Sequence, residues 1–154
     1  MYTEILDYVE TFIKNNVLEN GGVETGYLGE FPVLDLRAPH ILLEPKFDER
    51  EADSTRWDKA TYKIVLWIMV GFDLDYKKSV NETEKLLSGE TGLHAALKKL
   101  KVDPGFAALS TDPKWRVKPP MIKVGRTQFG IMQKTEYKIN TAQVNLDIYL
   151  NVEK

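Results

Sequence analysis

The sequence predicts a two-layer α+β fold, in which two helices pack on one face of a mainly antiparallel sheet. Two amphipathic helical patterns and four or so strand patterns support this prediction, because elements with one apolar side are stable only when they bury those sides against each other. The 154 residues are 43% hydrophobic and 29% charged, which fits one globular domain over residues 1–154 with a sizeable core.

The amino-terminal part of the chain predicts one helix followed by turns. Apolar residues recur at steps of three and four over residues 2–17, with charged residues between them, as on a helix with one buried side. The Asn-Gly-Gly sequence at 20–22 should end the helix, because glycine adopts the left-handed conformation of a C-cap. Residues 23–39 contain glycines and prolines, and we expect turns around a short strand at 33–36.

The next part of the chain predicts two strands with a long loop between them. A short strand over 40–44 should end at Pro45, and the polar residues 46–58 are expected to form a loop of a length that is usually functional or disordered. Residues 59–72 have the pattern of a strand, and in the middle of this stretch the side chains on both faces are apolar. This indicates a central strand that is covered on both sides. Its second face carries Val65, Trp67 and Met69.

The carboxyl-terminal half predicts a helix and two strands. Residues 79–82, Ser-Val-Asn-Glu, match a capping box at a helix start, and the helix should be interrupted near 88–89 and end at 103–105. Residues 106–120 contain three prolines and read as irregular. A strand is expected over 121–127 with a loop around 129–131, and then the clearest strand pattern, over 141–152, with one apolar and one polar face.

The charges are unevenly distributed along the chain. The net charge is −2, but residues 98–126 hold eight bases and two acids, and residues 44–58 hold six acids and three bases. This distribution indicates either two surfaces of opposite sign or solvated charges scattered around the fold, and the sequence leaves both interpretations open. A basic stretch with Phe106 and Trp115 is compatible with nucleic-acid binding, but its spacing matches no recognised module.

Several function classes find no support in the sequence. There are no cysteines and only two histidines, so we expect no thiolate metal site and no thiol nucleophile. No phosphate loop or nucleophile elbow is present, and His40 and His94 read as ordinary polar residues. The longest apolar run, residues 64–70, is too short to span a bilayer. We therefore expect a protein that is not an enzyme, with no cofactor, no metal, no membrane contact and no export signal.

Two helices can cover only one face of the predicted sheet. The other face, with Val65, Trp67 and Met69, then needs cover from elsewhere, since exposed apolar patches commonly mark interaction sites. The long loop folding back over this face and a second subunit are both possible, and we favour the subunit.

In their order, the predicted elements resemble the tail terminator proteins of long-tailed bacteriophages. The resemblance covers residues 41–150, and its parts are Glu44-Pro45, the strand Tyr62 to Val70, Leu86-Leu87, Leu93-His94-Ala95-Ala96-Leu97, Asp103-Pro104-Gly105-Phe106, Ile122 to Gly125 and the closing strand Ala142 to Leu150. This chain departs from the family in its longer stretch over 23–39.

The resemblance implies a structural virion protein of the tail-neck region, assembled in the host cytoplasm. Such a protein forms a hexameric ring that caps the tail tube, stops its polymerisation and joins the tail to the head connector or stopper protein, while double-stranded DNA passes through the ring. It also implies that the loop at 46–58 orders on assembly. A head–tail connector or stopper remains an alternative, as does a non-viral small α+β domain that serves as a binding module, a monomeric adaptor or an enzyme.

Two sets of site residues follow as hypotheses. In a head-to-tail ring one patch meets a different patch of the next copy, so the acidic loop could meet the basic region 98–126, with Trp57 as an apolar anchor. The expected interface residues are Arg50, Asp53, Arg56, Trp57, Val65, Trp67, Met69, Lys98, Lys123 and Arg126. The residues expected to line the channel are Gln143, Asn145 and Asn151.

Overall fold

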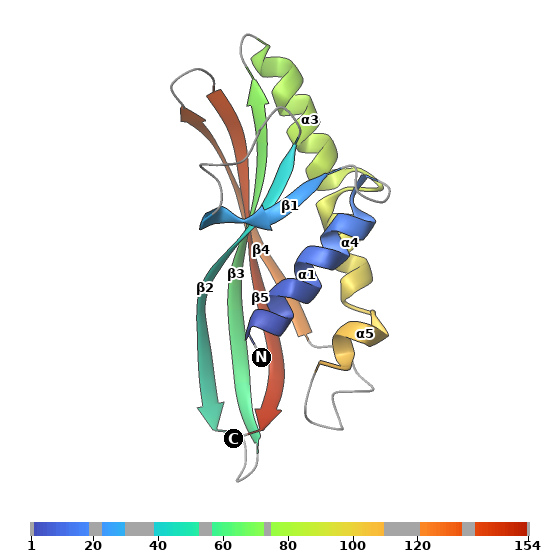
Figure 1. Cartoon of the computed structure of the whole chain (residues 1–154), viewed down its shortest axis with the longest axis vertical. Coiled ribbons are helices and arrows are strands. Elements are labelled where there is room, and N and C mark those ends of the chain that lie inside the picture. Colours follow the sequence, from blue (N-terminus) through green and yellow to red (C-terminus); the bar gives the residue numbers. More distant parts are fainter. Residues whose placement is uncertain are drawn as a thin grey trace.

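The computed structural model describes residues 2–18, 23–29, 39–52, 57–72, 75–109, 121–133 and 138–153. These residues form a sheet with helices on one face, so the predicted α+β class is confirmed (Figure 1). The described strands pair in the order β1 (Glu24–Tyr27), β2 (His40–Ala52), β3 (Trp57–Phe72), β5 (Lys138–Glu153) and β4 (Met121–Gln133). Every neighbouring pair is antiparallel except β1 with β2, as the prediction of a mainly antiparallel sheet requires.

Strands β3 and β5 form the long central ladder of the sheet. They pair from Trp57 opposite Glu153 to Phe72 opposite Lys138. The predicted alternation of β5 is confirmed, because its apolar residues from Ala142 to Leu150 are buried against the helices. β3 is buried on both faces in its middle, as its sequence pattern indicates for a central strand.

The loop predicted over residues 46–58 is wrong for residues 46–52 and 57–58, which are in strands, and its residues 53–56 lie outside the described residues. β2 continues to Ala52, and residues 44–52 pair with residues 58–65 of β3. The sequence predicts that Pro45 ends the strand, because proline has no N–H to donate to a ladder. Pro45 instead lies beyond Leu43, the last β2 residue paired with β1, and next to an irregularity in the register. Edges and bulges are the positions at which a strand tolerates proline.

The first helix forms as predicted. α1 (Tyr2–Asn16) buries Ile5, Val9 and Ile13 completely. Leu18, two residues beyond the helix, has a left-handed φ of 50°. The predicted stop at 20–22 and the short strand at 33–36 lie outside the described residues. β1 was not predicted, because four residues with a glycine among them carry too weak a pattern.

The second helical region starts earlier than the capping box suggests. α3 (Tyr76–Ser88) has Asp75 as its N-cap, whose carboxylate accepts a hydrogen bond from the Lys78 amide. Ser79 is buried inside the first turn and donates its hydroxyl to the Tyr76 carbonyl. The predicted interruption is confirmed, because a separate helix, α4 (Leu93–Leu100), follows.

A short helix, α5 (Pro104–Ala107), replaces the start of the stretch that we expected to be irregular. Asp103 caps it by accepting a hydrogen bond from the Phe106 amide at 3.0 Å. Proline suits the first position of a helix, because a backbone N–H there has no hydrogen-bond partner within the helix and proline lacks that N–H. The rest of that stretch, residues 110–120, lies outside the described residues.

Strand β4 is longer than predicted, and the loop expected around 129–131 is wrong. The strand runs to Gln133, with Phe129 opposite Ala142 and Ile131 opposite Asn140. Its one irregularity lies between Val124 and Thr127. Gly130, which suggested a loop, is tolerated inside an edge strand.

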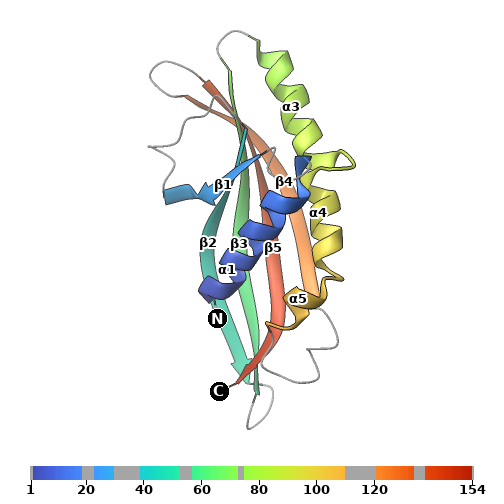
Figure 2. The same ribbon diagram turned by 45° about the vertical axis from the view of Figure 1, so that its right-hand side comes forward.

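The core lies between the helices and one face of the sheet. α1 and α3 contact the sheet directly, and α4 packs against both of these helices, as Figure 2 shows from a second side. A second, smaller apolar cluster lies on the opposite face, where buried Leu42, Met69 and Ile139 are packed with Leu28, Trp67 and Met132.

Candidate functional site

The face of the sheet that points away from the helices holds five of the thirteen site residues predicted from the sequence, namely Val65, Trp67, Met69, Gln143 and Asn145. We call it the outer face and define it by residues that lie opposite one another on β2, β3 and β5: Leu42, Glu44, Lys63, Val65, Trp67, Met69, Gln143, Asn145 and Asp147. Strand alternation places these residues on the side opposite the main core. The outer face is the candidate functional surface.

The expectation that Val65, Trp67 and Met69 lack cover within one chain is wrong for two of the three. Met69 is 0% exposed and Val65 is 5% exposed in the single chain. Met69 belongs to the small apolar cluster with Leu42, against which Leu28 packs just after β1. Two of these side chains therefore have almost no surface left to offer to a neighbouring subunit, and only Trp67 remains partly exposed.

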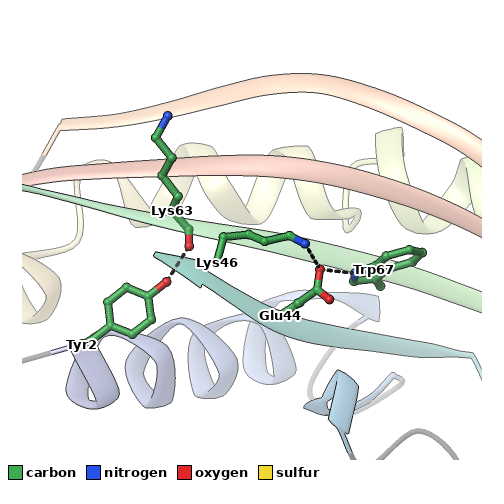
Figure 3. A network of polar contacts seen from close by, with 5 residues as sticks. All are labelled: Tyr2, Glu44, Lys46, Lys63 and Trp67. Carbon is green, nitrogen blue, oxygen red and sulfur yellow. Dashed lines mark hydrogen bonds and ion pairs between the residues drawn. The ribbon is translucent and has the colours of Figure 1, made fainter. Parts of the chain in front are cut away.

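Trp67 is held in place by a carboxylate (Figure 3). Its indole N–H donates to Glu44 Oε1 at 3.4 Å, and the Lys46 ammonium lies 2.9 Å from the same oxygen. The lysine thus balances the charge of the carboxylate next to the ring. A pair this exposed contributes about 0–1 kcal/mol, so its main effect is to fix the orientation of the indole on the outer face.

A second charged pair lies further along the outer face. The Lys63 ammonium is 3.8 Å from Asp147 Oδ2, which also accepts a hydrogen bond from the Tyr149 hydroxyl at 3.4 Å. The Lys63 carbonyl accepts a hydrogen bond from the Tyr2 hydroxyl of α1 (Figure 3). Lys63 therefore contacts both the helical layer, through its backbone, and the outer face, through its side chain.

The predicted interface and the predicted channel lining are not two separate surfaces. Val65 lies directly opposite Asn145, and Trp67 lies directly opposite Gln143. Directly opposed residues on antiparallel strands have neighbouring side chains on one face, so any contact that covers Val65 and Trp67 also covers these two polar residues. Asn151 lies opposite Lys59, and its side chain is outside the described part.

The remaining predicted interface residues are dispersed. Arg50 is exposed on β2, and Lys98 is exposed on α4 in the helical layer, on the other side of the sheet from Trp67. Lys123 and Arg126 are exposed on β4 at the far side of the sheet. Asp53, Arg56 and the side chain of Trp57 lie outside the described residues.

Sequence reasoning missed a set of exposed apolar side chains on β4. Met121, Phe129 and Ile131 are 60%, 67% and 56% exposed. The signal was present, because Phe129 and Ile131 alternate as strand residues do. It was overlooked because Gly130 between them suggested a loop.

The junction between α1 and α5 contains a tyrosine, Tyr8, whose pKa lies above its ordinary value. Burial, and then the hydrogen bond and negative charge of Asp103, raise the pKa of Tyr8 to about 12. The Tyr8 hydroxyl donates to Asp103 Oδ2, and its ring stacks on Phe106 with centroids 5.6 Å apart. The Tyr8 hydroxyl therefore stays protonated at neutral pH and donates a hydrogen bond. We interpret this contact as one that joins α1 to α5.

No family model matches this chain, and a search of curated proteins finds no relative. Within the described ranges, no group of three or more His, Asp or Glu side chains is arranged to hold a metal ion. No helix in those ranges is long and apolar enough to cross a bilayer.

Proposed function

We propose that this protein is a structural subunit of a phage tail terminator, which forms a ring on the finished tail tube, stops tube polymerisation and joins the tail to the head connector. The proposal starts from the resemblance in element order. The observation that favours it most in the fold is a long sheet whose described helices lie on one face (Figure 2) and whose outer face carries two lysine–carboxylate pairs. A subunit of this kind can turn its helices outward and its sheet toward a channel.

The charge pattern of the outer face suits a channel for DNA. Phosphate groups bind lysine and arginine side chains by displacing counterions. Lys46 lies at Glu44 and Lys63 lies near Asp147, so each of these lysines already has a carboxylate beside it. Gln143 and Asn145 between them carry no charge. Such a lining would let DNA slide without being held.

The partners and location follow from the proposal. The ring is expected to be a hexamer of this chain, bound to the tail tube protein on one side and to the head connector or stopper protein on the other, with double-stranded DNA passing through without sequence-specific contacts. The protein would be found in the tail-neck region of the virion and in the host cytoplasm during assembly. This function requires neither catalysis nor a cofactor.

The first test uses tail tubes from the same virus. Electron microscopy should show rings at one end of tubes mixed with the purified protein, and tube subunits polymerising in its presence should give shorter tubes of uniform length. Tubes that stay uncapped and unchanged in length would overturn the proposal. Rings that bind the connector but not the tube would indicate a head–tail stopper instead.

A second test places positive charge on the outer face. We expect Gln143→Lys with Asn145→Lys to slow genome ejection from assembled virions while leaving assembly intact, because the two new ammonium groups can bind DNA phosphates where the wild-type side chains are uncharged. Asn81→Lys with Ser88→Lys is the matched control, since both residues are exposed on α3 in the helical layer. Equal ejection rates in both variants would place the outer face away from the DNA.

A further inference from the structure

We propose that copies of this chain join edge to edge, with β4 of one copy pairing in antiparallel fashion with residues 44–52 of β2 of the next copy. The inference rests on the proposed ring for its biological role. It differs from that proposal in naming the surfaces that meet and the kind of bond that joins them, namely a backbone ladder between sheets.

On both sides of the sheet the outermost strand has a neighbouring strand on one side only among the described residues. Within these residues the backbone of β4 pairs with β5, and the backbone of β2 beyond Leu43 pairs with β3. Figure 2 shows the two edges on opposite sides of the sheet, with β3 and β5 between them. An edge strand presents a row of N–H and C=O groups that can pair with another chain.

The strand directions allow the sheet to continue from copy to copy. Each of the pairs β2–β3, β3–β5 and β5–β4 is antiparallel, so β2 and β4 run in opposite directions. A second copy rotated about an axis roughly along the strands keeps these directions, and its β4 then lies antiparallel to β2 of the first copy. This contact joins two different edges, and contacts of that kind close into rings when the rotation allows it.

The two edges also carry opposite charge. Residues 44–52 contain four acids and two bases, whereas residues 121–133 contain two bases, Lys123 and Arg126, and no acid. Pairing β2 with β4 therefore brings opposite charges together, while pairing two β4 edges would bring like charges together. The charges select the head-to-tail contact over a two-fold symmetric one.

Apolar side chains beside the β4 edge supply the surface to be buried. Phe129 and Ile131 are 67% and 56% exposed on β4. Large exposed apolar residues on a long edge strand promote uncontrolled association unless a partner covers them. A neighbouring copy on this edge would cover them and give the contact an apolar anchor.

The chain contains no cysteine, so introduced thiols test the contact directly. Glu51→Cys on β2 is combined in turn with Lys123→Cys, Gln128→Cys or Gln133→Cys on β4, all at exposed positions. Within one chain the two edges are three strand spacings, or about 14 Å, apart, which is too far for a disulfide. Any disulfide between the edges, or link by a short bis-maleimide, therefore joins two copies.

We expect one of the three pairs to give a ladder of linked oligomers, with the protein alone or on tail tubes, and single-cysteine variants to link weakly. Rings or capped tubes without any such link would overturn this inference and leave the proposed function standing. Efficient self-linking of a β4 single-cysteine variant would also overturn it. Linked oligomers that never cap a tube would overturn the proposed function alone, and a protein that stays monomeric in every condition would overturn both.

A charge variant gives an independent readout. Arg126→Glu with Gln128→Glu should raise the concentration needed for half-maximal assembly about tenfold, because it places acids against an acidic edge. Lys77→Glu with Lys85→Gln, at exposed positions of α3, changes the net charge equally on the helical layer and should leave assembly unchanged. Circular dichroism and a urea midpoint check that both variants fold. Equal assembly by the two variants would contradict the edge contact.

Discussion

A buried polar contact between α3 and β5 gives the sharpest test of how the helical layer is held on the sheet. The Asn140 side-chain amide donates to Thr83 Oγ1 at 3.3 Å, and the Thr83 hydroxyl donates to the Ser79 carbonyl at 2.8 Å. Asn140 is 4% exposed and Thr83 is 2% exposed. Thr83→Val keeps the shape of the side chain and removes both hydrogen bonds, so the Asn140 amide loses its acceptor in a buried site.

The cost follows from the desolvation of that amide. A buried donor left without a partner costs about 1–3 kcal/mol, whereas the Ser79 carbonyl keeps its place in the helical ladder. With an m-value of about 2 kcal/mol/M in urea, the midpoint of unfolding should fall by about 0.5–1.5 M. Urea titrations followed by circular dichroism, fitted with a shared m-value, measure this shift.

The double variant Thr83→Val with Asn140→Leu provides the control. Replacing both polar partners by apolar groups of similar shape can be nearly neutral, so we expect the double variant to be more stable than Thr83→Val alone, with a coupling energy of about 1–2 kcal/mol. The reasoning is refuted if Thr83→Val unfolds at the wild-type midpoint. It is also refuted if the double variant loses the sum of the two single losses.

Three further predictions concern the junction of α1 with α5 and the core. Because folding raises the pKa of Tyr8 from 10.0 to about 12, its contribution to stability should be complete below pH 10 and disappear as the pH rises toward 12; the difference in ultraviolet titration between wild type and Tyr8→Phe should show one phenol with the high pKa. Gly105→Ala should destabilise by about 1–2 kcal/mol, and by less in a Tyr8→Phe background, because the new Cβ would clash with the Tyr8 hydroxyl oxygen. Leu66→Ala, at a fully buried position of β3, should cost about 2–5 kcal/mol in urea unfolding.

These three predictions have matched controls. Val102→Ala, at a position that is 73% exposed, should change the free energy of unfolding by less than about 0.5 kcal/mol. Equal losses for Leu66→Ala and Val102→Ala would contradict the assigned core. Identical effects of Gly105→Ala with and without the Tyr8 hydroxyl would mean that the two residues are not in contact. A difference titration with its midpoint at the ordinary value of 10.0 would mean that burial and Asp103 do not raise the pKa of Tyr8.

Long periodic patterns were the reliable part of the sequence reasoning. The steps of three and four over residues 2–17 and the alternation over 141–152 each depend on many side chains, and both were found. The errors came from single residues taken as breaks. Pro45 and Gly130 suggested chain ends or loops, but both lie on sheet edges, where a strand tolerates proline and glycine because one side of its backbone has no strand partner.

The candidate surface was only partly predictable. The sequence placed Val65, Trp67 and Met69 on one face correctly, but exposure depends on what covers that face, and here Leu28 packs over the cluster that contains Met69. That Trp67 and Gln143 are direct neighbours depends on the pairing of β3 with β5. Such long-range register leaves no trace in the local spacing of residues, so it could not be inferred from one sequence.

The pairing of β3 with β5 has a consequence for how the chain reaches its fold. Ile64 lies opposite Leu146, so the ribosome must make α3, α4, α5 and β4 before β3 can pair with β5. Until then β3, which is apolar on both faces, has no strand partner on the side that β5 will occupy. Contacts between residues this distant in sequence slow folding, and intermediates that lack them expose apolar surface and are prone to aggregate. We therefore expect the nascent chain to depend on chaperones until residue 153 has emerged.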